Sequence, residues 1–230
     1  MKLYLAPLIL GLCGTIVLVS FGIWQLKRLA WKEGILAEIE MRITSEPSQI
    51  PTAPNIEDHR FIPVTVSGGF DGTDIPVFLS HDSGPIYRLI AAFQMQEGRR
   101  IMVDRGAIPG RGNPDPELRT APMVGLEIIG NLHWPDEVDS WTPDPDSRGV
   151  FFGRDIAKMA EVLGTEPILV VARDVSANLP PATPLPVTTT GIPNNHLGYA
   201  VQWFGLSFVW AGMTVFLMWR IRGRTAKDKV

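Results

Sequence analysis

Two uncharged stretches decide the architecture of this chain: LYLAPLILGLCGTIVLVSFGI, from Leu3 to Ile23, and GYAVQWFGLSFVWAGMTVFLMW, from Gly198 to Trp219. About 20 apolar residues in a helix cross a hydrocarbon core of about 30 Å, so each stretch is long enough for one span. The alternative for the first stretch is a cleaved signal peptide. The residues that follow it, Trp-Gln-Leu-Lys-Arg, contain no small-x-small cleavage site, and we therefore predict two uncleaved transmembrane helices.

The charges that flank the two spans predict their orientation. Five of the last 11 residues are basic, and the positive-inside rule therefore places the C-terminus in the cytoplasm, with the N-terminus on the same side. Lys27, Arg28 and Lys32 oppose this orientation, but the segment that follows them is far longer than the roughly 60 residues for which the rule holds. The N-terminus has no Arg- and Ser-rich transit sequence. We expect a multi-pass protein of the bacterial cell inner membrane, with both termini cytoplasmic and a periplasmic central domain.

Composition excludes several classes of protein. Between residues 33 and 174 the chain has 12 basic and 23 acidic residues, a balance that argues against nucleic acid as a partner. The single cysteine, Cys13, excludes a disulfide within one chain and a cysteine-based zinc site. The partner that the composition does predict is the lipid bilayer.

The two spans divide the chain into five parts. Residues 1–23 are expected to form the first transmembrane helix, and residues 24–46 a helical extension outside the membrane. Residues 47–193 form an extracytoplasmic β-rich domain with its linkers. Residues 194–219 comprise the second transmembrane helix with the motif that precedes it, and residues 220–230 form a basic cytoplasmic tail.

The central domain alternates strand-like runs with turn residues. Six runs have the character of strands: 61–67, 76–80, 86–95, 99–108, 124–134 and 167–173. Glu97-Gly98 predicts a tight hairpin turn between two of them. Asp155 is expected to cap a short helix over 156–163, which Gly164 ends. The predicted class is an α+β membrane protein: two transmembrane helices flank a small, mostly antiparallel β domain, barrel- or sandwich-like, with one short helix.

Small residues recur along both spans at a spacing that lets helix backbones approach closely in lipid. They are Gly198, Gly205 and Gly212, with Ser207 and Ala211, in the second span, and Gly11, Thr15 and Gly22 in the first. The alternative is that glycine is simply common in membrane helices. We predict a packed helical hairpin that uses these faces.

No segment carries a convincing catalytic signature. His81-Asp82-Ser83 contains the residue types of a hydrolase triad, but adjacent residues cannot converge in that geometry, and a polar turn is the simpler interpretation. Carboxylates cluster between residues 136 and 146, interleaved with prolines, which is typical of a solvated loop and not of an acid–base pair. We therefore predict that the chain is not an enzyme.

Polar and aromatic residues gather at the outer ends of the two spans. They are Trp24, Gln25, Arg28 and Trp31 after the first span, and Asn194, Asn195, His196, Tyr199 and Trp203 at the start of the second. In an antiparallel hairpin the two groups lie at the same depth. An imidazole is an axial ligand for haem iron, a basic side chain pairs with a propionate, and aromatic rings cover a porphyrin. This makes His196 a candidate haem ligand; the alternative is a membrane anchor of interfacial aromatic and basic residues.

Three motifs carry a resemblance that covers nearly the whole chain. They are FGIWQLKRLAWK, residues 21–32; VDRGAIP, residues 103–109; and NNHLGYAVQWF, residues 194–204. Together they resemble the signatures of the Surfeit locus protein family, a family of cytochrome oxidase assembly factors. Trp134-Pro135 and Trp141-Thr142-Pro143 also fit the middle of that family. Ala107 departs from the pattern, because the family has Trp at this position.

The resemblance implies a function for the outer ends of the spans. Family members assemble haem–copper terminal oxidases such as cytochrome c oxidase, and bacterial relatives are implicated in binding haem a and passing it to the catalytic subunit. His196 is then the expected contact to the haem iron, Trp24, Gln25 and Arg28 form the facing wall, and Tyr199 and Trp203 lie beside His196. The implied partners are the oxidase catalytic subunit and, as a candidate donor, a haem a synthase. The alternative is a cofactor-free membrane scaffold that stabilises an oxidase intermediate, and the client, of cytochrome c or quinol type, stays open.

Overall fold

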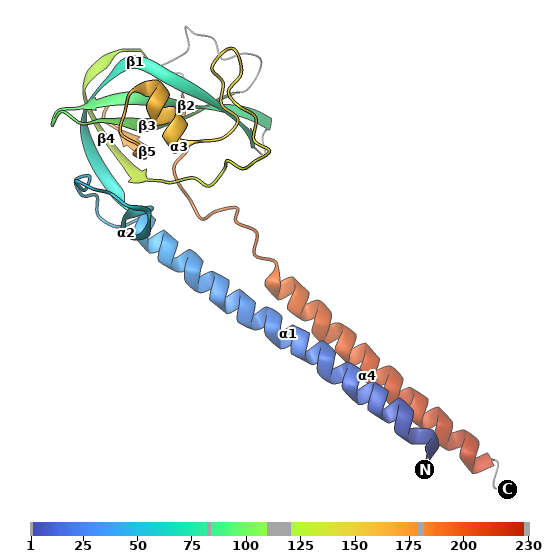
Figure 1. Cartoon of the computed structure of the whole chain (residues 1–230). Coiled ribbons are helices and arrows are strands. Elements are labelled where there is room, and N and C mark those ends of the chain that lie inside the picture. Colours follow the sequence, from blue (N-terminus) through green and yellow to red (C-terminus); the bar gives the residue numbers. More distant parts are fainter. Residues whose placement is uncertain (1, 82–83, 110–120, 179–181, 228–230) are drawn as a thin grey trace. The chain divides into compact units, whose positions relative to one another are not determined.

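A computed structural model describes residues 2–81, 84–109, 121–178 and 182–227 (Figure 1). The chain forms two compact units. The first, called the helical unit below, consists of Met1–Glu38 and Thr190–Val230, and the second, the barrel unit, of Ile39–Thr189. Asp82 and Ser83 of the predicted polar turn lie outside the described residues, as do the last three residues of the basic tail.

Two long helices make up the helical unit. They are α1 (Lys2–Ile43), whose last turn belongs to the barrel unit, and α4 (His196–Lys227), and they lie side by side and antiparallel (Figure 1). Both are long and apolar enough to cross a membrane, at Leu5–Ile43 and His196–Gly223. Only 11% and 6% of the residues in their most apolar windows are buried, which distinguishes them from the core helix of a soluble protein. The architecture fits a membrane protein.

Glycines of α1 bring the two helices into close contact, as the sequence predicts for the first span. The indole Nε1 of Trp210 donates a hydrogen bond of 3.1 Å to the carbonyl oxygen of Gly11. A Cβ added at Gly22 would lie 2.6 Å from the ring of Phe204, so only glycine fits there without displacing the ring. Close contacts of this kind stabilise helix association by van der Waals packing, because lipid provides no hydrophobic driving force for it.

The prediction of small contact residues in the second span is wrong for its three glycines and correct for Ser207. A Cβ added at Gly198, Gly205 or Gly212 would meet nothing within 4 Å, so these glycines lie away from α1. Among the α4 side chains whose burial the structure describes, the small residues Ala200 and Ser207 are buried, and these two are also seven residues apart. Sequence periodicity therefore predicted the spacing of the contact face, but a spacing of seven is satisfied by more than one face of the helix.

Five strands of the barrel unit close into a barrel with the order β1-β2-β3-β5-β4. They are β1 (Pro63–His81), β2 (Gly84–Met95), β3 (Arg100–Pro109), β4 (Met123–Leu132) and β5 (Leu169–Val175). Four neighbouring pairs are antiparallel, and β3 and β5 are parallel. An odd number of strands cannot close with every pair antiparallel, so one parallel pair is required. The predicted turn at Glu97-Gly98 joins β2 to β3, with Gly98 at φ +90°.

The first two predicted strands are one continuous strand. The sequence between them, GGFDGTD, is rich in turn residues, but β1 runs through it with a bulge between Phe70 and Asp74. A Cβ at Gly68 would overlap the backbone of β2, and one at Gly69 the backbone of β4. The two glycines therefore serve close approach of strands and not chain reversal, which explains why the sequence was misinterpreted.

Two short helices lie in the segments that precede β1 and that connect β4 to β5. The predicted helix is confirmed as α3 (Ile156–Leu163): the Asp155 side chain accepts from the Lys158 backbone N–H, and Gly164 ends the helix at φ +62°. A second helix, α2 (Ile56–His59), lies in the proline-punctuated segment before β1 and was not predicted. Its four residues are too few for a periodic signal.

Candidate functional site

Gln25 and His196 join the two helix ends that carry the outer sequence motifs. The imidazole Nδ1 of His196 lies 2.8 Å from the amide Oε1 of Gln25. An amide oxygen only accepts, so Nδ1 is the donor in this contact, and in a neutral imidazole the lone pair is then on Nε2. Gln25 is only 8% exposed, and its contact with His196 is partly buried in the helical hairpin. His196 is therefore oriented, and the nitrogen that remains is the one able to bind a metal.

The backbone around His196 is held by two further contacts. His196 is the first residue of α4, and the Tyr199 backbone N–H donates to the carbonyl oxygen of Asn195 in the first turn. Lys32 of α1 donates from its ammonium to the carbonyl oxygen of Pro193. The first contact lies within the start of α4, and the second fixes that start against α1, close to the Gln25–His196 hydrogen bond.

The other predicted residues of the first motif lie on a different surface from Gln25. Trp24 is 55% exposed. The guanidinium of Arg28 lies 3.8 Å from the centre of the Trp31 ring, a cation–π contact on the exposed side of α1. The structure thus groups Gln25 with His196 and leaves Trp24 and Arg28 on an exposed apolar and basic surface.

The two aromatic residues of α4 also differ in their surroundings. The Trp203 ring packs against Phe21 of α1, with ring centres 4.9 Å apart. Tyr199 is 51% exposed and lies one turn after His196. Tyr199 is therefore free to contact a flat apolar ligand beside the imidazole, whereas Trp203 is partly engaged in helix packing.

A second polar cluster, in the barrel unit, was missed by sequence analysis. Asp104 is fully buried and accepts hydrogen bonds from Arg88 Nε at 2.6 Å, from Arg154 Nη1 at 3.3 Å and from the Gly106 backbone N–H at 3.0 Å. Arg154 also pairs with Glu137, through Nε at 2.9 Å and through Nη2. The available signal was Asp104 itself, an acid in the middle of the apolar run that forms β3.

The ionisation of this cluster indicates a structural role. Burial raises the pKa of Glu137, but the hydrogen bonds and charge of Arg154 lower that pKa by more. Burial, followed by the charges of Arg154 and Arg60, lowers the pKa of His133 to about 3. The carboxylate thus stays ionised and the imidazole neutral, which suits ion pairing and not proton transfer at neutral pH. Glu137 lies in an exposed loop, as predicted, and the structure adds its ion pair with Arg154.

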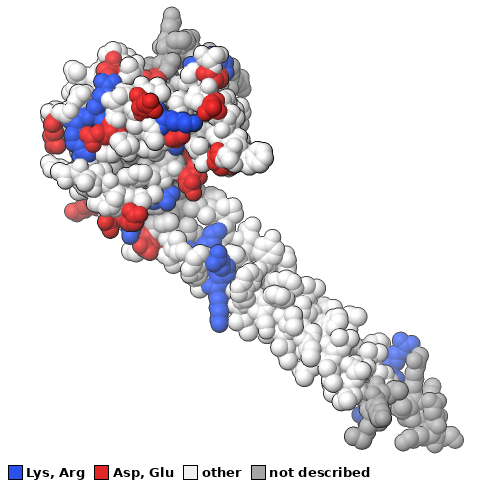
Figure 2. Space-filling view, viewed as in Figure 1, with Lys and Arg blue, Asp and Glu red and all other residues white. Residues whose placement is uncertain are grey.

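Surface charge is distributed differently on the helical unit and on the barrel unit. Figure 2 shows the visible face of the helical unit as uncharged over its apolar stretch, with basic side chains near both ends of that stretch. The visible face of the barrel unit carries interspersed acidic and basic side chains, as a water-exposed surface does. The two units therefore suit lipid and water, respectively.

These features define a class: a membrane protein in which an apolar helical hairpin with one buried His–Gln contact is connected to a small β-barrel. The family model of the SURF1 family matches residues 12–208, and the chain belongs to that family. It is 29% identical over 209 residues to Surfeit locus protein 1 of Xenopus tropicalis, covering 81% of this chain and 67% of the relative. Surfeit locus protein 1 of Homo sapiens is 28% identical over 210 residues, covering 82% and 69%. Family membership is consistent with a role in cytochrome oxidase assembly.

Proposed function

We propose that this protein assists the assembly of a haem–copper terminal oxidase by holding haem a at the outer membrane face and passing it to the catalytic subunit. The observation that carries the proposal is the hydrogen bond between His196 and Gln25, which leaves the imidazole Nε2 available as a ligand. Family membership supports the assembly role. The protein has no turnover of its own in this proposal.

The residues at the helix ends fit a haem. A metal-binding histidine commonly donates its second ring N–H to an acceptor that fixes its tautomer, and Gln25 Oε1 is such an acceptor for His196. No group of three or more His, Cys, Asp or Glu side chains lies together within the residues that the structure describes. A haem needs only axial ligands from the protein, because the porphyrin supplies the rest. Haem a, when bound, supplies the redox-active iron that the oxidase uses.

Each side chain at this end of the hairpin has a role in the proposal. His196 holds the iron, and Gln25 positions the imidazole. Tyr199, about half exposed and one turn after His196, offers its ring to the porphyrin body. Arg28 offers a cation to a propionate, since its guanidinium lies on the exposed side of α1.

The proposal includes a location and partners. The protein lies in a bacterial cell inner membrane with both termini in the cytoplasm and the barrel unit in the periplasm, as the basic C-terminal tail supports. Its partners are the oxidase catalytic subunit and a haem a synthase. Alkaline phosphatase inserted at the Glu97-Gly98 turn tests this topology: an active fusion supports it, and an inactive but stable fusion contradicts it.

A second candidate function is a cofactor-free scaffold. The same His196–Gln25 hydrogen bond is also what a purely structural clamp between two membrane helices requires. In this alternative the hairpin stabilises an oxidase intermediate by helix packing alone, and no side chain needs to bind iron.

Complementation separates the two candidates. Host cells that lack this protein are supplied with wild type, His196→Ala or His59→Ala, the last being a histidine control in α2 of the barrel unit. The haem-transfer proposal predicts that His196→Ala inserts in the membrane at normal levels but yields an oxidase depleted in haem a. A normal haem a content in the oxidase from His196→Ala cells would contradict the haem-transfer proposal.

A further inference from the structure

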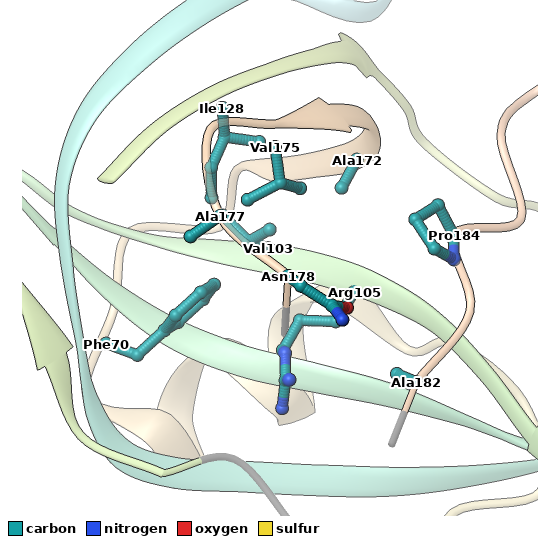
Figure 3. Close-up of a pocket in the computed structure, with 10 residues that line it drawn as sticks. All are labelled: Phe70, Val103, Arg105, Ile128, Ala172, Val175, Ala177, Asn178, Ala182 and Pro184. Carbon is teal, nitrogen blue, oxygen red and sulfur yellow. The ribbon is translucent and has the colours of Figure 1, made fainter. Parts of the chain in front are cut away.

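One end of the barrel interior encloses a cavity that the proposed function does not use. It has a volume of about 120 Å³ and is lined by side chains from β1, β3, β4 and β5 and from the chain that follows β5 (Figure 3). Its walls are mostly apolar, and its polar residues are Arg105 and Asn178. An apolar cavity with a few polar groups, in the mouth of a barrel, is a typical place for a small-molecule site.

The strand pattern explains why an arginine lies in this cavity. Side chains alternate between the two faces of a strand, so Ile101, Val103 and Arg105 of β3 share the inner face. Ile101 and Val103 are part of the main apolar core. Arg105 is the next inward position, and it is only 5% exposed. It is also the arginine of the VDRGAIP motif, to which the helix-end site assigns no role.

The guanidinium of Arg105 is held in surroundings that disfavour charge. Burial lowers its pKa, and the carboxylate of Asp74 opposes this effect. The guanidinium carbon lies 5.5 Å from the centre of the Phe70 ring, and Figure 3 shows both side chains on the cavity wall. An arginine has five N–H donors, so existing contacts of its guanidinium do not exhaust its capacity to bind an anion.

The cavity is a built feature of the fold. Gly106 has φ +106°, and a Cβ there would overlap the carbonyl of Thr183. This glycine lets the chain after β5 pair with β3 through two backbone hydrogen bonds, of 2.8 Å and 2.9 Å, between Ala107 and Thr183. Ala182 and Pro184, on either side of that pair, are thereby held as cavity walls. The cavity wall therefore depends on backbone pairing as well as on side-chain packing.

We propose that this cavity is a binding site for a small monocarboxylate. Arg105 is the counter-ion of the carboxylate, and the apolar wall contacts a short hydrocarbon or aromatic group of the ligand. A planar guanidinium matches a carboxylate in bidentate geometry. The single cation favours a monoanion over a phosphate dianion. The cavity, at about 120 Å³, is smaller than an engineered cavity of roughly 150 Å³ that binds benzene, so the apolar part of the ligand is no larger than one aromatic ring, and benzoate is the largest suitable probe.

Benzoate binding to the full-length protein in detergent tests the site, by saturation-transfer NMR and calorimetry. We expect saturable binding of benzoate that weakens at least about tenfold in Arg105→Gln, the loss expected for a charge-assisted hydrogen bond. Arg148→Gln, which changes an exposed arginine in a surface turn, should bind as wild type does. Ala177→Phe, at the exposed rim, should block benzoate while Arg105 is kept.

Controls separate loss of the site from loss of the fold. A near-UV circular dichroism spectrum that matches wild type is required of each variant, and Ala177→Phe keeps the test decisive if Arg105→Gln unfolds. A peptide that ends in a free valine carboxylate is compared with the same peptide ending in an amide, to show whether the natural ligand can be the C-terminus of a chain. Selective binding of the free acid supports a chain end as the ligand. Binding of benzoate but of neither peptide supports a free metabolite. Wild type without saturable binding of either, or Arg105→Gln and Ala177→Phe variants that bind as wild type does, would overturn the proposal.

Discussion

Replacement of Asp104 by asparagine should destabilise the barrel unit strongly. The substitution keeps the size of the side chain and an oxygen that can accept from the Gly106 backbone N–H, but it removes the charge that faces Arg88 and Arg154. Removing one partner of a buried ion pair costs about 3–5 kcal/mol. Arg154 keeps its pair with Glu137, so we expect about 3 kcal/mol, near the lower bound. With a urea dependence of about 2 kcal/mol per M, the unfolding midpoint falls by roughly 1.5 M.

A buried thiol reports this transition without interference from the helices. In a Cys13→Ala background, Ala92→Cys introduces a cysteine at a fully buried position of the barrel wall, which reacts with a thiol reagent only on unfolding. Asp144→Asn is the matched control, because Asp144 is exposed and pairs with an exposed Lys158; its midpoint should move by less than about 0.5 M. A loss below about 1 kcal/mol for Asp104→Asn would refute the view that this ion pair holds the barrel wall together.

Three further predictions concern the other contacts. Gln25→Leu should leave the protein in the membrane but weaken haem a retention by about tenfold or more, because the tautomer of His196 is no longer fixed. Unchanged haem a retention in the purified variant would show that Gln25 does not position His196. The pKa of His133 is about 3 in the folded protein, against an ordinary value of 6.5. Between these two values the unfolded chain binds a proton at His133 that the folded chain does not bind. The stability of the barrel unit should therefore fall as the pH falls from 6.5 towards 3. A His133→Leu variant should show a smaller fall in its urea midpoint between pH 7 and pH 5, and an identical fall would contradict this assignment. Gly22→Leu should destabilise the hairpin by about 1–3 kcal/mol, because the larger side chain overpacks the helix contact. Gly205→Leu should be tolerated, because Gly205 faces open space. Equal effects of the two substitutions on the melting temperature would argue against the observed helix face.

The sequence predicts features that depend on local chemistry. The structure contains the two apolar helices, the hairpin turn at Glu97-Gly98 and the helix capped by Asp155. Each of these features depends on residues that are close together in the chain: an uninterrupted apolar stretch, turn residues or capping residues. The close approach of strands at Gly68 and Gly69 could not be distinguished from a turn, since glycine serves both a reversal and a close approach, and only the neighbouring strands decide between them.

Long-range pairing explains the rest of what was missed. Asp104 and Arg154 are 50 positions apart in the chain, and nothing near either residue predicts that they meet. The contact between Gln25 and His196 was predicted only as a shared depth in the hairpin, and the structure adds the hydrogen bond and the tautomer. The phase of the α4 contact face also depends on α1, because small residues occur on more than one face of that helix.

The most direct test of the central claim is the haem a content of the purified protein. Wild type, His196→Ala and the control His59→Ala are isolated in detergent from a host that makes haem a, and haem a per polypeptide is measured by pyridine haemochrome and by the Soret spectrum. The account predicts haem a in wild type and in His59→Ala, and its loss or a shifted Soret band in His196→Ala. Wild type without haem a, or His196→Ala with the same haem a content and spectrum as wild type, would contradict it.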